Sequence, residues 1–489
     1  MIDLTLHEDR LARAIEQARK KRILIPTFEE QKRPEKIDPR VKEKLRRTGL
    51  WDVDAANLFR ITWKNEPVTR GGQFGGVNFL EFPSALTGVN ARIIALVGKW
   101  FPTGSHKVGA SFACLAPRLV TGQFDPTTQK AVWPSTGNYC RGGAYNSHLL
   151  GCESIAILPE GMSRERFEWL AKIAGEVIAT PGTESNVKEI FDACKHLRTT
   201  RTDIMIFNQF EEFGNHLWHY DVTGHAMEEA LRQIMGPKDR FAGVTVTTGS
   251  AGTIGCGDYL KQVFPTSKIA AGEALQCPTL LNNGFGAHRI EGIGDKHIPW
   301  IHNVKNTDLV IAIDDCDVMA LARLFNEPAG QSYLKTSGVP VEMIDKLPLV
   351  GISGMANLLQ AIKFAKYYEL SRRDIVLTVL TDSMELYGSR VAELAEKFGA
   401  YDTINAAIDF HRHLQGVTTD AMLELTYTER KRIHHLKYYT WVEQQGRDAE
   451  ELNAQWYDDD YWDGVHGQVG AIDALIRQFN ARAGVLETF

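Results

Sequence analysis

Short apolar segments alternate with amphipathic segments through the middle of the chain, from about residue 77 to residue 383. ARIIALVGKW (91–100) and FAGVTVTT (241–248) are rich in β-branched residues and predict strands. TGHAMEEALRQIM (223–235) carries apolar residues at helical spacing and predicts a helix. Strands that alternate with helices are typical of parallel sheets covered by helices on both faces. The unit recurs too often for one sheet, so the sequence predicts an α/β protein with two three-layer domains.

The two ends of the chain lack this alternation. Residues 1–75 combine a charged helical segment with the stretch FEEQKRPEKIDPRVKEKLRR, which predicts an N-terminal extension that wraps the surface rather than entering a core. Residues 401–489 are mostly helical by pattern and rich in aromatic and charged residues, which predicts a C-terminal extension. Between them we expect a large α/β domain made of residues 76–104 and 227–400, and a small α/β domain made of residues 105–226.

Composition limits the classes of partner and compartment. The 489 residues include 55 basic and 61 acidic side chains, and the net charge of −6 argues against nucleic acid or an anionic membrane surface. No apolar run approaches the roughly 18–20 residues of a membrane span, and the first residues lack a signal-peptide core. The seven cysteines form no CxxC pair, which favours reduced thiols. The sequence therefore predicts a cytoplasmic protein with no nucleic-acid or membrane partner and no metal.

Lys107 is the candidate catalytic residue. A Pro-Thr-Gly-Ser turn runs directly into it, and a helix is predicted to follow, capped by Thr103 or Ser105. In the first turn, the helix dipole and an apolar wall would both lower the pKa of the ammonium group. A partly neutral lysine is what Schiff-base chemistry requires. Taken alone, a lysine at this position is more often a solvated residue at a helix start.

Three further turns follow predicted strands. TGSAGT (248–253) places small residues before a helix, where backbone N–H groups can bind a phosphate. PSTGNYCRGG (134–143) offers N–H and hydroxyl donors to a carboxylate. Ser383 ends the strand-like LTDS, and parallel strands present ligand-binding groups at that end. Each of these turns, considered by itself, is also compatible with an ordinary turn or helix cap.

The lysine, the carboxylate loop, the phosphate loop and the strand-end hydroxyl, in that order, resemble the fold-type II pyridoxal-phosphate enzymes. The similarity extends from about residue 78 to residue 390 and is strongest to the cysteine synthase and cystathionine β-synthase branch. It includes the blocks ILPEGMSRERFEWLAKIAGEVI, FNQFEEFGNHLWHYDVTGHAM, GFGAHRIEGIGDKHIP and GISGMANLLQA. The resemblance implies pyridoxal 5'-phosphate as cofactor, a small-molecule amino-acid substrate, and a homodimer.

The resemblance also implies a role for each residue at a matching position. Lys107 would hold the cofactor as a Schiff base and then act as general acid and base. Asn138 would lie beside the phenolic oxygen of the cofactor, and Ser383 would face its pyridine nitrogen. The residues implied to bind the cofactor phosphate are Gly249, Ser250, Ala251, Gly252 and Thr253. Those implied to bind the substrate carboxylate are Ser135, Thr136, Gly137, Tyr139 and Gln209.

The hydroxyl of Ser383 bears on the reaction type. A neutral partner leaves the pyridine nitrogen unprotonated, which makes the ring a weaker electron sink than in aminotransferases. We therefore expect β-elimination or β-replacement on an amino acid with a β-leaving group, through an aminoacrylate. A dehydratase or ammonia-lyase acting on a hydroxy amino acid is one alternative, and a non-catalytic binding protein that kept the fold is another. Tyr139 and Cys140 occupy positions where the family has small residues, so the resemblance does not identify the natural substrate.

Overall fold

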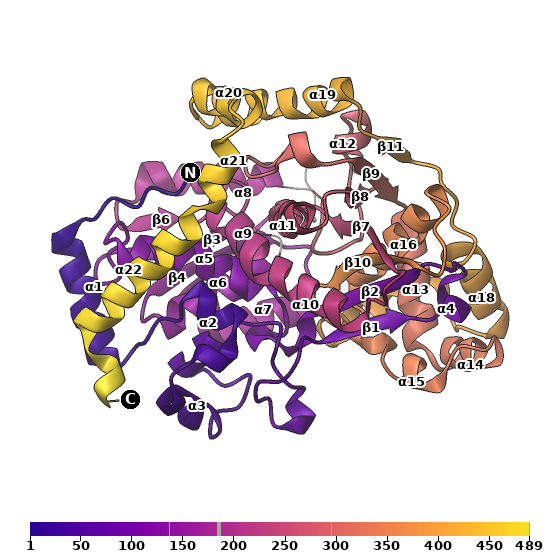
Figure 1. Ribbon diagram of the computed structural model, residues 1–489, viewed down its shortest axis with the longest axis horizontal. Helices are drawn as coiled ribbons and strands as arrows, with labels where there is room; N and C mark the ends of the chain where they lie inside the picture. Colours follow the sequence, from indigo (N-terminus) through magenta and orange to yellow (C-terminus); the bar gives the residue numbers. More distant parts are fainter. Residues whose placement is uncertain (136, 183–186, 295, 489) are drawn as a thin grey trace.

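Two sheets form the centre of the molecule, which is described here by a computed structural model covering residues 1–135, 137–182, 187–294 and 296–488 (Figure 1). Within these ranges, one sheet has seven strands in the order β1-β2-β10-β7-β8-β9-β11 and the other has four in the order β5-β4-β3-β6. The strands of the larger sheet are β1 (Phe79–Phe82), β2 (Arg92–Val97), β10 (Asp374–Leu380), β7 (Arg240–Thr247), β8 (Lys268–Ala274), β9 (Leu309–Ile313) and β11 (Met422–Glu424). Those of the smaller sheet are β5 (Glu176–Thr180), β4 (Glu153–Pro159), β3 (Lys130–Pro134) and β6 (Ile204–Ile206).

Both sheets are mainly parallel. The smaller sheet pairs in parallel throughout, and in the larger sheet β2, β10, β7, β8 and β9 are parallel neighbours. The edge strands β1 and β11 are antiparallel. Every residue of β9 and β10 is buried, as expected for strands with helices on both faces. The predicted α/β class with parallel-type sheets is confirmed, and the short strand β11 lies in the segment that was expected to be mostly helical.

Helices cover the faces of both sheets (Figure 1). α16 packs against β7, β9 and β10, and α6 and α8 pack against the smaller sheet. The helices between residues 84 and 234 are α4 (Ser84–Thr87), α5 (Lys107–Val120), α6 (Asn138–Leu149), α7 (Arg164–Ile173), α8 (Val187–Thr200), α9 (Phe213–Trp218) and α10 (Gly224–Ile234). Those between residues 255 and 414 are α11 (Gly255–Val263), α12 (Thr279–Asn282), α13 (Asp315–Asn326), α14 (Pro328–Thr336), α15 (Val341–Ile344), α16 (Ile352–Tyr367), α17 (Gly388–Phe398) and α18 (Thr403–Ile408).

The two ends of the chain meet on the back of α5. The N-terminal extension contains α1 (Glu8–Lys21), α2 (Phe28–Lys32) and α3 (Pro39–Leu45), and the C-terminal extension contains α19 (Tyr427–Lys437), α20 (Ala449–Tyr457), α21 (Tyr461–His466) and α22 (Gln468–Ala483). α22 packs against both α1 and α5, and the figure shows the indigo and yellow helices together (Figure 1). Asp473 of α22 accepts hydrogen bonds from the backbone N–H groups of Phe28 (2.7 Å) and Glu29 (3.1 Å) at the start of α2.

The N-terminal extension contributes more to the core than its charged sequence indicates. Phe28, Ile37, Val41 and Leu45 are buried within the stretch expected to lie on the surface. These four positions are separated by charged residues, so the segment covers the core with one face and presents the other to water. Within the described ranges, no helix combines the length and the apolar character that crossing a bilayer requires.

Candidate active site

Lys107 is the first residue of α5, as the turn before it predicts. The Ser105 hydroxyl accepts a hydrogen bond from the Lys107 backbone N–H (3.4 Å). Thr103 does not cap the helix: it adopts a left-handed conformation (φ 71°), and its buried hydroxyl has no hydrogen-bond partner in the described part of the chain. The turn is fixed to the end of β10 because the His106 N–H donates to the Thr381 carbonyl (3.3 Å).

The amine of Lys107 contacts the predicted phosphate loop. Its Nζ is 3.4 Å from the Ser250 hydroxyl. Burial lowers the pKa of Lys107 from 10.5 to about 8, because the charged form loses hydration that its neighbours do not replace. The expected direction of the shift is therefore confirmed, with desolvation as its cause. A substantial fraction of the amine is neutral near pH 8 and available as a nucleophile or base.

Aromatic side chains pack against the turn that precedes Lys107. His106 is buried and stacks on Trp63 of the N-terminal extension, with ring centroids 5.4 Å apart. His219 contacts His106 edge to face, and the Trp63 indole N–H donates to the Thr223 hydroxyl (3.0 Å). Burial holds the pKa of His106 well below its usual value, so this ring is neutral beside Lys107. The N-terminal extension thus packs against the turn that holds Lys107.

The predicted phosphate loop follows β7 and leads into α11. Ala251 adopts a left-handed conformation (φ 60°), and a Cβ on Gly252 would lie 2.0 Å from the Asn215 amide oxygen. Asn215 donates to the Ser250 hydroxyl (3.0 Å) and to the Gln209 carbonyl (3.0 Å). The backbone turns into the short helix Gly252–Ile254, whose first N–H groups have no intrahelical partner. Three of the five predicted residues, Ser250, Ala251 and Gly252, therefore lie in one tight loop suited to an anion, and the other two, Gly249 and Thr253, flank it.

The predicted carboxylate loop follows β3. The Ser135 hydroxyl accepts hydrogen bonds from the Gln209 side-chain amide (3.2 Å) and from the Gly137 N–H (3.1 Å). A Cβ on Gly137 would lie 2.0 Å from Nη1 of Arg166, so this position has room only for glycine. The structure thus brings Ser135, Gly137 and Gln209 together, as predicted. Thr136 lies outside the described residues.

Asn138 joins the two sheets. Its side-chain amide donates to Oδ2 of Asp382 (2.5 Å), and the Tyr387 hydroxyl donates to the same oxygen (2.6 Å). Asn138 is the first residue of α6, beside the smaller sheet, whereas Asp382 follows β10 of the larger one. Burial raises the pKa of the Asp382 carboxyl. The buried Asn138 Oδ1 has no hydrogen-bond partner among the described residues and is free to accept one from a ligand.

Two predicted residues occupy the site without a contact that defines their role. The Tyr139 ring is buried against Trp133, with centroids 5.4 Å apart, and burial raises the pKa of its hydroxyl well above the usual value. Ser383 is buried at the end of the β10 segment, two residues beyond the Thr381 carbonyl that binds the lysine turn. The roles given to these two side chains by the family resemblance stay predictions.

A set of buried polar residues that the sequence did not predict holds the loops in place. Arg166 of α7 is fully buried; its Nη1 lies 3.1 Å from Glu291, and its Nη2 donates to the Tyr387 hydroxyl (2.8 Å). Asn215 and Asp382 complete the set. Asp382 stands directly before Ser383 at the strand end, which is a signal that could have identified it. Arg166 and Glu291 carry no such signal, because they are separated by more than a hundred residues.

Comparisons with known proteins agree with this arrangement. The family model described as "Pyridoxal-phosphate dependent enzyme" matches residues 99–382, which include Lys107 and end just before Ser383. A probable cysteine synthase of Bacillus subtilis is 29% identical over 61% of this chain and 89% of its own. A cysteine synthase of Staphylococcus aureus is 30% identical over 58% of this chain and 84% of its own. The crystal structure of a cysteine synthase from Entamoeba histolytica shares the fold, with a TM-score of 0.56 at 22% identity, over 70% of this chain and 93% of that one.

Proposed function

Because this chain belongs to the pyridoxal-phosphate-dependent enzyme family, we propose that it catalyses β-elimination or β-replacement on an amino acid with a leaving group on its β-carbon. One observation carries the proposal. A lysine of lowered pKa stands 3.4 Å from the phosphate-type loop, and that loop is joined through Asn215 to the Gln209–Ser135 pair. The lysine that would bind the cofactor, the loop that would bind its phosphate and the site for the substrate carboxylate therefore lie in one cluster.

The residues present fit pyridoxal 5'-phosphate. The loop of Gly249, Ser250, Ala251, Gly252 and Thr253 offers N–H groups at a helix start to the phosphate, and a side chain on Gly252 would collide with Asn215. The buried, unpaired Asn138 Oδ1 suits a hydroxyl donor of the ring. When bound, the cofactor withdraws electrons from the α-carbon of the amino acid and acidifies its α-proton.

Residues of the chain itself bind the substrate and transfer the proton. Ser135, Gly137 and Gln209 hold the substrate carboxylate, and so fix the α-carbon relative to Lys107. The neutral Nζ of Lys107 accepts the α-proton and returns a proton later in the reaction. Ser383 supplies a neutral hydroxyl rather than a carboxylate to the ring, which favours departure of a β-group over transamination. Two of the relatives are named cysteine synthase, and their reaction class supports this choice.

The test combines an absorbance titration with product analysis. We expect the purified protein to show near-visible cofactor absorbance that changes on addition of one β-substituted amino acid, such as O-acetylserine, O-phosphoserine or serine. Release of keto acid and ammonia identifies elimination, and a new amino acid identifies replacement. Lys107→Ala should lower turnover by at least about 1000-fold, because it removes the proton-transfer group. The exposed Lys172→Ala is the control and should keep wild-type activity. Normal turnover in Lys107→Ala would refute the assignment.

We also propose that the protein acts as a cytoplasmic homodimer. We further propose that residues 76–104 and 227–400 form the large α/β domain and that residues 105–226 form the small one. The origin of the strands supports the division, since the smaller sheet uses only residues between 130 and 206. The seven cysteines form no CxxC pair in the sequence, which supports a reducing compartment. Light scattering that gives a monomer mass at micromolar concentration would refute the dimer.

A further inference from the structure

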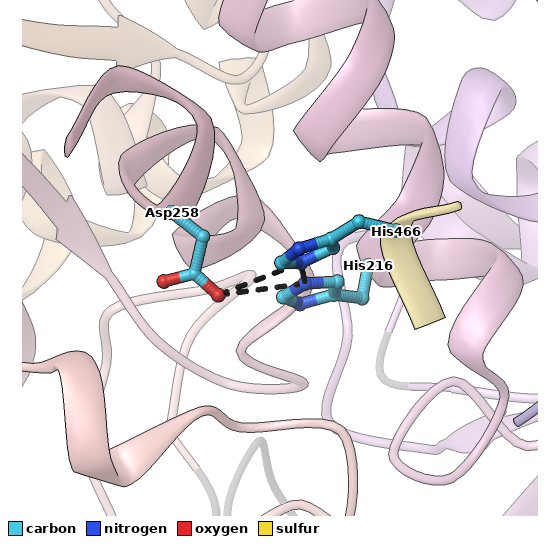
Figure 2. Close-up of side chains that lie close together, drawn as sticks. All are labelled: His216, Asp258 and His466. Atoms are coloured by element: carbon cyan, nitrogen blue, oxygen red, sulfur yellow. Dashed lines mark hydrogen bonds and ion pairs between the residues drawn. The ribbon is translucent and has the colours of Figure 1, made fainter. Parts of the chain in front are cut away.

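Three buried side chains from distant parts of the chain converge behind the phosphate loop. His216 belongs to α9, Asp258 to α11 and His466 to the end of α21, and the carboxylate points toward both imidazole rings (Figure 2). The two Nε2 atoms are 3.0 Å apart. Oδ2 of Asp258 lies 3.6 Å from Nε2 of His216 and 3.8 Å from Nε2 of His466. All three residues are buried.

We propose that His216, Asp258 and His466 bind a divalent transition-metal ion, with Zn²⁺ as the ion that best fits the ligands. A point equally distant from the three ligand atoms lies about 2.0 Å from each, which matches Zn–N and Zn–O bond lengths in proteins. Two imidazole nitrogens and one carboxylate oxygen are a donor set that suits zinc and its neighbours in the first transition row.

Asp258 gives the cluster its negative charge. Among the described residues, no lysine or arginine forms an ion pair with Asp258; the nearby Lys261 pairs with Asp308 instead (2.6 Å). One of the two Nε2 atoms carries the proton of the hydrogen bond between the rings, and binding of the ion would shift that proton to Nδ1 of the same ring, which leaves a lone pair on each Nε2. A metal ion would supply the positive charge that the buried carboxylate lacks.

Asn303 lies beside the carboxylate of Asp258 and is the candidate for the fourth ligand of the ion. Asn303 donates its Nδ2 to Oδ2 of Asp258 (2.9 Å), whereas its buried Oδ1 has no hydrogen-bond partner among the described residues. Rotation of this amide would exchange the two atoms and present the oxygen to the ion. Asn306 donates to Oδ1 of Asp258 (2.6 Å) and orients the carboxylate from behind. The Nδ1 atoms of His216 and His466 are buried and have no hydrogen-bond partner among the described residues.

The position of the site gives the ion a structural role. His216 directly follows Asn215, which binds Ser250, and Asp258 lies in the first turn of the helix that leaves the phosphate loop. His466 comes from the C-terminal extension. An ion held by all three would fasten that extension to both elements that shape the loop. This consequence rests on the proposed function of the loop, whereas the metal site itself does not.

The decisive measurement is metal content in protein prepared without a polyhistidine tag. The holoenzyme is dialysed against a chelator, incubated with Zn²⁺, freed of excess ion and measured by mass spectrometry. We expect about one Zn²⁺ per chain in the wild type and a higher unfolding temperature than in the chelated protein. Asp258→Asn and His466→Asn should bind Zn²⁺ at least about 100-fold more weakly, because each removes a ligand. His435→Asn, an exposed histidine of α19, is the matched control and should bind like the wild type.

A second measurement separates loss of the site from loss of the fold. Co²⁺ in place of Zn²⁺ should give the wild type a visible band from nitrogen and oxygen ligands, absent in Asp258→Asn while its far-ultraviolet circular dichroism is unchanged. Wild-type protein that holds no Zn²⁺, or both variants binding as tightly as the wild type, would overturn the proposal and leave a hydrogen-bonded imidazole pair. Since neither readout uses turnover, the result is independent of whether the proposed reaction is right.

Discussion

The amine of Lys107 lies 3.4 Å from the Ser250 hydroxyl, in surroundings that lower its pKa from 10.5 to about 8. The neighbouring histidines His106 and His219 are also held neutral by burial, so they add no positive charge to the site at pH 7. Burial therefore lowers the pKa of three neighbouring side chains. At the scale of the residue, burial rather than a specific charged partner lowers the pKa of the lysine.

This environment predicts a pH dependence for cofactor uptake. In protein freed of cofactor, only the neutral amine can react with an aldehyde. The lowered pKa means that the protonated amine dominates below about pH 8, so the uptake rate should rise about tenfold per pH unit up to that value and then level off. Stopped-flow absorbance after addition of pyridoxal 5'-phosphate measures the rate.

The analogue pyridoxine 5'-phosphate, which has no aldehyde, provides the control for that experiment. Its binding uses the same phosphate loop but no bond to the amine, so its affinity should not rise as the pH passes 8. A plateau for pyridoxal 5'-phosphate that begins only near pH 10, the range of an ordinary lysine, would contradict the lowered pKa.

At the scale of the element, the site is built from turns that follow strands, and Asn215 connects two of them. Its amide bonds both Ser250 of the phosphate loop and the Gln209 carbonyl beside the carboxylate loop. The same side chain fills the space that a Cβ on Gly252 would need. The loop conformation therefore depends on a residue of α9 as much as on its own glycines.

Replacement of Gly252 tests this dependence. The Cβ of Gly252→Ala would lie 2.0 Å from the Asn215 amide oxygen and would displace that side chain. We expect cofactor affinity to fall about five- to thirtyfold, since a hydrogen bond worth about 1–2 kcal/mol to Ser250 is lost. Equilibrium dialysis measures the affinity. Gly470→Ala in α22, where a Cβ meets nothing within 4 Å, should leave affinity unchanged. Equal affinity in the two variants would show that the loop adapts without Asn215.

At the scale of the whole molecule, buried polar contacts hold the two sheets together across the site. The Asn138–Asp382 hydrogen bond and the Arg166–Glu291 ion pair both cross from elements around the smaller sheet to segments of the larger one. Arg390 also binds Glu291. The N- and C-terminal extensions add further contacts, since α22 packs against α5 and Trp63 stacks on His106.

Loss of the buried arginine should destabilise the fold strongly. Arg166→Met leaves Tyr387 without its donor and removes one of the two arginines around buried Glu291. We expect the free energy of unfolding to fall by about 3–5 kcal/mol, as for other broken buried ion pairs. Urea denaturation followed by circular dichroism measures it.

Arg164→Met is the matched control, two residues away on the same helix. Arg164 is largely exposed, and its ion pair with Glu168 lies at the surface, so the free energy of unfolding should change by less than about 1 kcal/mol. Similar losses in both variants would mean that burial of the Arg166 pair does not stabilise the protein.

The sequence determined the features that depend on neighbouring residues. The alternation of strand and helix patterns fixed the α/β class, and the turn before Lys107 fixed its place at the start of α5, because both follow from local periodicity and turn chemistry. The loops around Ser135 and Gly252 were identified for the same reason. The buried half of the N-terminal extension was not, because charged residues separate its apolar positions.

The tertiary structure alone decided which distant side chains meet. Arg166 with Glu291, Asn138 with Asp382, and the cluster of His216, Asp258 and His466 join positions that are separated by between 42 and 250 residues. No local pattern encodes such pairs, because each is made by the packing of whole helices and strands rather than by the spacing of residues along one of them. The edge strand β11 has the same origin: three residues gain a strand conformation only because β9 offers them a free edge.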